Sequence, residues 1–147
     1  MDDLRPQARP YSVVQSAQHQ ILVCKACKHK DQACKPGFDM INKLRAAIQS
    51  AGLAEDFEVS GTACLAGCVP DHGAPCVIGY RATAKATWLF GDIDPDQSLD
   101  DLIAFAGSYA GLQDGWMTGK DLPASLVDTT LARIPAAMIV TREGAIQ

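Results

Sequence analysis

The stretch FEVSGTACLAGC, residues 57–68, joins a run of strand-forming residues to two closely spaced cysteines. In residues 57–63 apolar or small residues alternate with polar ones, which is the period of a half-buried β-strand. The same arrangement occurs earlier in the chain, where the apolar, mostly β-branched run of residues 21–23 leads directly to Cys24. Two predicted strands therefore each deliver the chain to a group of cysteines.

The segment between these strands has the pattern of an amphipathic helix. Pro36 and Gly37 open it, and Gly52 follows its end. The apolar residues at helical spacing are Phe38, Ile41, Leu44, Ala47 and Ile48. In a βαβ unit the two strands are parallel neighbours, so their carboxyl ends lie side by side. We therefore expect the two cysteine groups to meet at one end of a sheet.

Two more strands and a second helix are predicted downstream. Residues 76–80 and 84–93 are rich in strand formers, and the segment between them predicts a hairpin. A helix begins at Ser98, where Asp101 completes a weak capping box. Its apolar face comprises Leu99, Leu102, Ile103 and Ala106. The order β-α-β-β-β-α predicts an α/β fold whose mixed sheet has about four strands with flanking helices.

The length of 147 residues suggests one domain with additions at both ends. Residues 1–19 are polar and form a flexible N-terminal lead, and residues 20–111 form the domain that carries the cysteines. Residues 112–147 form a C-terminal extension with a further apolar stretch at 134–140. We place three aromatic side chains in the core, namely Trp88, Phe90 and Phe105.

The composition excludes several classes of function. The chain is 48% hydrophobic and 20% charged, and its net charge of −4 gives no electrostatic reason for nucleic-acid binding. The N-terminus, MDDLRPQARPY, lacks the apolar core of a signal peptide, and no apolar run is long enough to cross a membrane. We expect a cytoplasmic protein. In that compartment, clustered cysteines more often bind metal or carry out redox chemistry than form disulfides.

The cysteine spacing is compatible with more than one chemistry. The cysteines are Cys24, Cys27, Cys34, Cys64, Cys68 and Cys76. A structural zinc site needs two close ligand pairs, which residues 24–27 and 64–68 supply. A [2Fe–2S] cluster needs four thiolates but tolerates looser spacing, because two irons share them. A thioredoxin-type dithiol of Cys24 and Cys27 is a third alternative, although the polar loop delays the helix that such a motif requires.

The layout resembles that of thioredoxin-like [2Fe–2S] ferredoxins, which include the Shethna-type ferredoxins and the small cluster-bearing subunit of respiratory complex I and related hydrogenases. In that group a strand ends in a cysteine, a second cysteine precedes a helix, and a Cys-x3-Cys pair follows the second strand. The matching residues here are Val23-Cys24, Ala33-Cys34 and Cys64-Leu-Ala-Gly-Cys68. The resemblance implies a thioredoxin-like fold and one [2Fe–2S] cluster bound by Cys24, Cys34, Cys64 and Cys68.

The same resemblance implies electron transport without catalysis. Such a carrier shuttles single electrons between its redox partner proteins, a reductase and an acceptor enzyme, and the ferredoxin relatives often form homodimers. The sequence has no Ser-His-Asp layout, phosphate-binding glycine loop or Rossmann fingerprint, so we expect no enzyme. The alternatives are a zinc- or cobalt-binding structural or metal-carrier module, and a dithiol oxidoreductase that uses Cys24 and Cys27.

Residues 20–100 also resemble an uncharacterised bacterial family described only as predicted metal-binding, whose members often lie near cobalamin-synthesis genes. The shared features are the Val-Cys-Lys-Ala-Cys segment, the Cys-Leu-Ala-Gly-Cys segment and KATWLFGDIDP at residues 85–95. This family carries a Cys-x2-Cys pair and a further downstream cysteine, which makes Cys27 and Cys76 alternative ligands. The chain departs from it in the segment VPDHGAP, which is longer than the resemblance implies.

Lysines surround the first cysteine group, at Lys25, Lys28, Lys30 and Lys35. An ordinary solvated loop accounts for them. They could equally offset the negative charge of four thiolates and two sulfides, or dock an acidic partner. Nothing in the sequence separates these interpretations.

Overall fold

A computed structural model of the chain describes residues 18–25, 28–29, 32–33, 35–62, 65, 76–94, 96–97 and 99–137. Several predictions fall outside these residues. They concern Cys27, Cys34, Cys64, Cys68, Lys30, Ser98, most of the N-terminal lead, the VPDHGAP segment and the end of the C-terminal extension.

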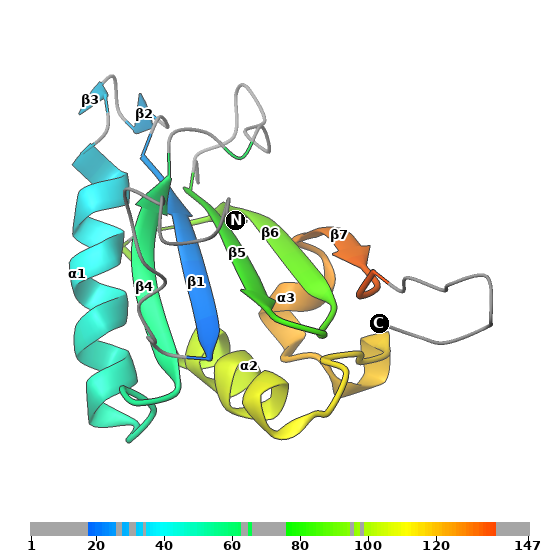
Figure 1. Ribbon diagram of the computed structural model, residues 1–147. Helices are drawn as coiled ribbons and strands as arrows, with labels where there is room; N and C mark the ends of the chain where they lie inside the picture. Colours follow the sequence, from blue (N-terminus) through cyan, green and yellow to red (C-terminus); the bar gives the residue numbers. More distant parts are fainter. Residues whose placement is uncertain are drawn as a thin grey trace, which may run out of the picture.

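The described elements include the predicted strands and helices up to the second long helix, but two short strands that were not predicted lie between the first strand and the first helix. In chain order they are β1 (His19–Cys24), β2 (Lys28–His29), β3 (Gln32–Ala33), α1 (Lys35–Ser50), β4 (Phe57–Thr62), β5 (Cys76–Ala82), β6 (Thr87–Ile93), α2 (Asp100–Gly111), the 3-10 helix η2 (Gly119–Asp121), α3 (Ala124–Val127) and β7 (Thr130–Ile134). Figure 1 shows β2 and β3 beyond the arrowheads of β1 and β4, next to the start of α1.

Within the described residues, the main sheet has five strands in the order β4-β1-β5-β6-β7. Strands β1 and β4 are parallel, whereas β1–β5, β5–β6 and β6–β7 are antiparallel. The α/β class and the mixed sheet are thus confirmed. The sheet has one strand more than predicted, because β7 pairs with β6 at its edge.

Both long helices cover the same face of this sheet. Paired residues of neighbouring strands project to one side, and Ile21 pairs with both Val59 and Tyr80. Tyr80 contacts α2, since its hydroxyl donates to the carbonyl of Leu102 at 2.9 Å and its ring lies 4.7 Å from that of Phe105. The same core contains the buried α1 residues, which are Met40, Ile41, Leu44 and Ile48. The result is a two-layer core with a sheet on one side and helices on the other.

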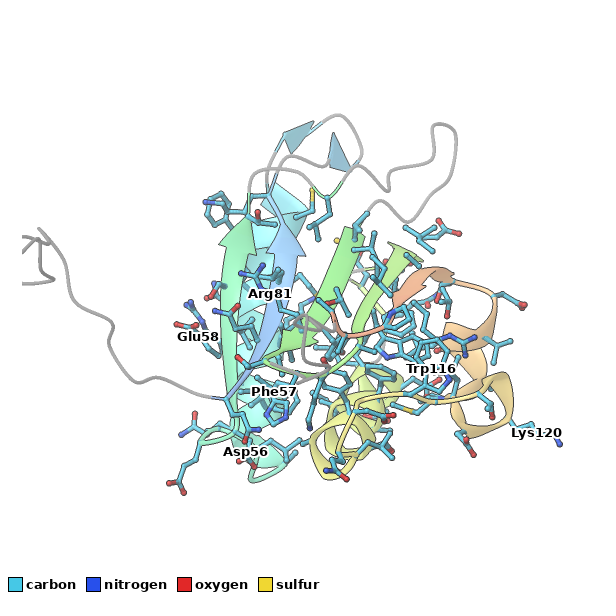
Figure 2. The ribbon with its side chains drawn as sticks, turned by 45° about the vertical axis from the view of Figure 1, so that its right-hand side comes forward. Asp56, Phe57, Glu58, Arg81, Trp116 and Lys120 are labelled. Carbon is cyan, nitrogen blue, oxygen red and sulfur yellow. The ribbon has the colours of Figure 1, made fainter. Side chains whose placement is uncertain are left out.

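The opposite face of the sheet is polar near the start of β1. Arg81 Nε donates to Gln20 Oε1 at 2.7 Å, and Gln20 Nε2 donates to Glu58 Oε1 at 3.0 Å. These side chains come from β5, β1 and β4. Figure 2 labels Arg81, which belongs to β5, and Glu58, which belongs to β4. No helix among the described residues has the length and apolarity that crossing a bilayer requires.

The core predictions succeed with one exception. Trp88, Phe90 and Phe105 are buried, as predicted. Phe38, which the helical pattern placed on the buried face of α1, is 52% exposed instead. It lies to one side of the buried face of α1, which consists of Gly37, Met40, Ile41, Leu44 and Ile48.

Candidate functional site

The predicted convergence of two chain segments is present at the carboxyl ends of β1 and β4. The parallel register pairs Cys24 with Thr62, which lies two residues before Cys64. The Lys25 amide continues the pairing and donates to the carbonyl of Thr62 at 2.8 Å. The two chain segments that lead to the cysteine groups therefore leave the sheet side by side.

Cys24 is fully buried at this end of the sheet. It belongs to a small apolar cluster with Val77, against which Leu65 and Leu89 pack. Cys76 is also fully buried, but it belongs to the main core on the face covered by the helices. The side chain of Cys24 is thus separated from that of Cys76 by the sheet, although the two strands are neighbours.

Two glycines allow other chain segments to approach Cys24 and Lys25 closely. A methyl group added to Gly37 would lie 2.5 Å from the carbonyl oxygen of Cys24, so the first turn of α1 rests on the end of β1. A methyl group added to Gly61 would lie 2.4 Å from Cδ of Lys25. The Lys25 side chain therefore crosses β4 where β4 has no side chain.

Two of the six cysteines belong to described strands of the main sheet. Cys24 ends β1 and Cys76 begins β5. Cys27 lies in the chain between β1 and β2, Cys34 between β3 and α1, and Cys64 and Cys68 after β4, all outside the described residues. Among the residues that the structure does describe, no three His, Cys, Asp or Glu side chains gather as metal ligands would. The structure thus brings Cys24 to the segment that leads to Cys64 and leaves the complete ligand set as a prediction.

A second polar group, which sequence analysis did not identify, lies at the other end of β1. His19 and Lys85 are 3% and 7% exposed, and Lys85 Nζ lies 2.8 Å from His19 Nε2. Lys85 Nζ also donates to the carbonyls of Tyr109 and Ala110 at 3.0 and 3.1 Å. His19 Nδ1 lies 3.0 Å from the carbonyl of Asp56. These contacts join the start of β1 and the β5–β6 hairpin to the last turn of α2.

The contacts of His19 define its protonation. A carbonyl oxygen can only accept, so Nδ1 carries the hydrogen and Nε2 accepts from the Lys85 ammonium. Burial, supported by the nearby Lys85 charge, lowers the pKa of His19 below its ordinary value of 6.5. Burial also lowers the pKa of Lys85, and it raises the pKa of Tyr109 to about 12. This arrangement holds the neutral imidazole in place and serves the packing of α2 on the sheet.

Comparison with protein families gives one match. The model of the family described as "Protein of unknown function (DUF1636)" matches residues 21–136. The chain belongs to the DUF1636 family. The match runs from β1 to the residues just after β7, so the DUF1636 region includes the cysteine groups and the fifth strand. No curated protein and no solved structure matches the chain.

Proposed function

We propose that this DUF1636 protein is a one-electron carrier that holds a [2Fe–2S] cluster through Cys24, Cys34, Cys64 and Cys68. The observation that carries the proposal is the register of β1 and β4, which sets Cys24 beside the residues leading to Cys64. Four thiolates from two chain segments are the ligand set that such a cluster requires.

The sheet supports a thioredoxin-like fold for this carrier. In the order β4-β1-β5-β6, a parallel βαβ unit is followed by two antiparallel strands, and α2 returns to the face that α1 covers. The succession of a βαβ unit, two strands and a helix fits the element order that the resemblance to thioredoxin-like ferredoxins implies. Strand β7 is then an addition at the β6 edge.

The surroundings of Cys24 fit a thiolate ligand of a cluster. The cluster would accept and release one electron at a time. The protein residues would hold the cluster and limit its contact with water. Cys24 lies in an apolar cluster with Val77, Leu65 and Leu89. Gly37 lets the first turn of α1 approach the Cys24 backbone, so the segment that carries Cys34 begins its helix next to Cys24.

The burial of Cys24 favours a cluster over a thioredoxin-type dithiol. A cysteine that attacks a substrate disulfide must be reachable, and reactive cysteines are partly exposed for that reason. Cys24 has no exposed surface. The placement of Cys76 in the main core likewise favours a packing role for that cysteine.

The test is the metal content of anaerobically purified protein, measured by iron and acid-labile sulfide assays with a visible absorption spectrum. We expect brown protein with sulfide-to-iron charge-transfer bands and about two irons per chain. Cys24→Ser and Cys64→Ser should each abolish the bands, whereas Cys76→Ala, the matched control, should retain them.

Other outcomes would replace the proposal. Protein without iron and sulfide that holds zinc, and is colourless, or cobalt(II), and shows the visible bands of that ion, would establish a metal-binding module. Colourless protein that stays metal-free after reconstitution with iron and sulfide, with a titratable Cys24–Cys27 pair, would establish a dithiol protein. If the cluster is present, Cys27→Ala against Cys34→Ala identifies the fourth ligand, and loss of the bands in Cys34→Ala alone is the expected result.

A further inference from the structure

An exposed aromatic ring lies beside the proposed cluster end of the sheet. The chain has four phenylalanines, and Phe57, Phe90 and Phe105 are at most 4% exposed. Phe38 is 52% exposed, in the first turn of α1 and next to Gly37, which contacts the Cys24 backbone. The ring therefore offers an apolar contact to a partner at this end of the sheet.

The side chain of Lys25 is held next to this ring. Its backbone is fixed by the bond to Thr62, and its alkyl chain lies against Gly61. Its ammonium nitrogen is 5.8 Å from the centroid of the Phe38 ring. The Lys25–Phe38 pair is thus a small surface with a positive charge beside an apolar ring, one residue from Cys24.

The charge of the surrounding segment has the opposite sign to that of the whole protein. Residues 25–35 contain four lysines and one aspartate, so their side chains sum to +3, apart from the charge of a bound cluster, in a chain whose net charge is −4. Lys28 begins β2 and Lys35 begins α1, so the backbone brings both to the same end of the molecule (Figure 1). A charge distribution of this kind orients an incoming partner before contact.

We infer that the Lys25–Phe38 surface is the docking site for an electron-transfer protein whose own contact surface is acidic around an apolar centre. The inference rests on the proposed function, because it assigns the place where electrons enter and leave. The ring supplies the desolvated contact at the centre, and the Lys25 ammonium beside it supplies a positive charge that steers association.

The first experiment measures electron transfer from the dithionite-reduced, cluster-loaded protein to two haem proteins of opposite charge. One electron leaves the cluster and reduces a ferric haem to the ferrous state. With acidic cytochrome b5 the second-order rate constant should fall as ionic strength rises, although both proteins have a negative net charge. With basic cytochrome c the rate constant should show a weaker dependence. A rate constant for cytochrome b5 that rises with salt would overturn the inference.

Variants separate the charge from the ring. Lys25→Gln should lower the rate constant for cytochrome b5 about two- to fivefold at low ionic strength, and the difference should vanish at high salt. Phe38→Ala should lower it about fivefold or more at every ionic strength, because it removes an apolar contact. Lys120→Gln is the matched control, since Lys120 is exposed in η2 and away from β2 and β3 (Figure 2), and it should leave the rate constant unchanged.

A binding measurement tests the same surface without electron transfer. Labelling with 4-fluorophenylalanine places fluorine on the four phenylalanines, and the Phe38 resonance is assigned by Phe38→Leu. The redox-inert anion hexacyanochromate(III) should broaden the Phe38 resonance more than the cation hexaamminechromium(III) does. Lys25→Gln should reduce this difference. Equal broadening by the two ions would contradict the basic surface.

The two proposals fail in different ways. If the purified protein holds no iron and sulfide, the proposed electron-carrier function is wrong, and the docking role is wrong with it. If the protein holds the cluster but Phe38→Ala and Lys25→Gln transfer electrons as fast as the unchanged protein, the proposed function stands and only the docking surface is wrong. If the anion effect persists but Phe38→Ala has normal rates, the surface binds anions without serving as the docking site.

Discussion

Gly37 sets how closely the first turn of α1 approaches the end of β1. A glycine inside a helix is destabilising by about 0.5–1 kcal/mol relative to alanine, so its presence needs a steric reason. At Gly37 the reason is the carbonyl oxygen of Cys24, which leaves no room for a methyl group. At Gly107, which is exposed in α2, there is no such neighbour within 4 Å.

These two glycines should respond to the same substitution in opposite ways. Gly37→Ala forces the helix away from β1 and should lower the unfolding free energy by about 1–3 kcal/mol. Gly107→Ala should raise it by about 0.5–1 kcal/mol, because alanine favours the helix. Urea denaturation of both variants measures the difference. A stabilised Gly37→Ala protein would show that α1 does not rest on Cys24.

Prediction from sequence failed for single residues where the fold departs from a regular pattern. Helical spacing placed Phe38 with Ile41 and Leu44, but spacing alone does not show how wide the buried face of the helix is, and Phe38 falls outside it. The pairing of His19 with Lys85 joins residues from the start of the sheet and from a hairpin turn. Only the tertiary fold brings them together, so local sequence patterns carry no signal for it.

At the scale of elements, strand β7 depends on one side chain. Arg133 Nη1 donates to the carbonyl of Met117 at 2.7 Å, and its guanidinium lies 4.0 Å from the ring centroid of Trp116 and 5.7 Å from that of Trp88. The residue thereby joins β7 to β6 and to the segment after α2. Both tryptophans of the chain report on this contact.

We expect Arg133→Ala to loosen β7. The loss of the stacking contacts and of one hydrogen bond should lower the unfolding free energy by about 1–2 kcal/mol. Intrinsic fluorescence should shift to longer wavelength, because Trp116 is already 37% exposed and would lose its cover. Lys120→Ala, the matched loss of an exposed positive charge, should change neither quantity.

The elements differ in how well the sequence predicts them. Strands β1, β4 and β5 and helices α1 and α2 have strong periodicity and were predicted within a few residues. Strand β6 starts at Thr87, later than predicted, because Ala84 adopts a positive φ of 63° in the hairpin turn. Strand β7 was missed because it is a short edge strand with no buried residue, so its sequence lacks the alternation of a half-buried strand.

At the scale of the whole molecule, the His19–Lys85 pair makes stability depend on pH. The pKa of His19 is lowered in the folded state, so the unfolded chain binds a proton more readily near neutral pH. This contribution to stability is complete above the unfolded value of 6.5 and decreases as pH falls from there towards the lower folded value. Acid therefore weakens the contact between β1 and the end of α2.

We expect the unfolding free energy to fall on acidification from about pH 7.5 to about pH 5.5. His19→Gln should flatten this slope even if it lowers stability overall. His29→Gln, which changes a histidine of β2, serves as the control and should keep the slope. Urea denaturation at several pH values measures it, and an unchanged slope in His19→Gln would assign the pH dependence to other groups.

The contact at the start of β1 also determines where this protein can be shortened. The family match begins at residue 21, two positions after His19. A truncated version that starts there keeps every residue of the match but removes one acceptor of the buried Lys85 ammonium. In such a fragment the Lys85 ammonium keeps the carbonyls of Tyr109 and Ala110 but loses His19, and β1 loses its first two residues, so the fragment should express poorly. The smallest piece worth producing therefore begins before Gln18, upstream of the family boundary.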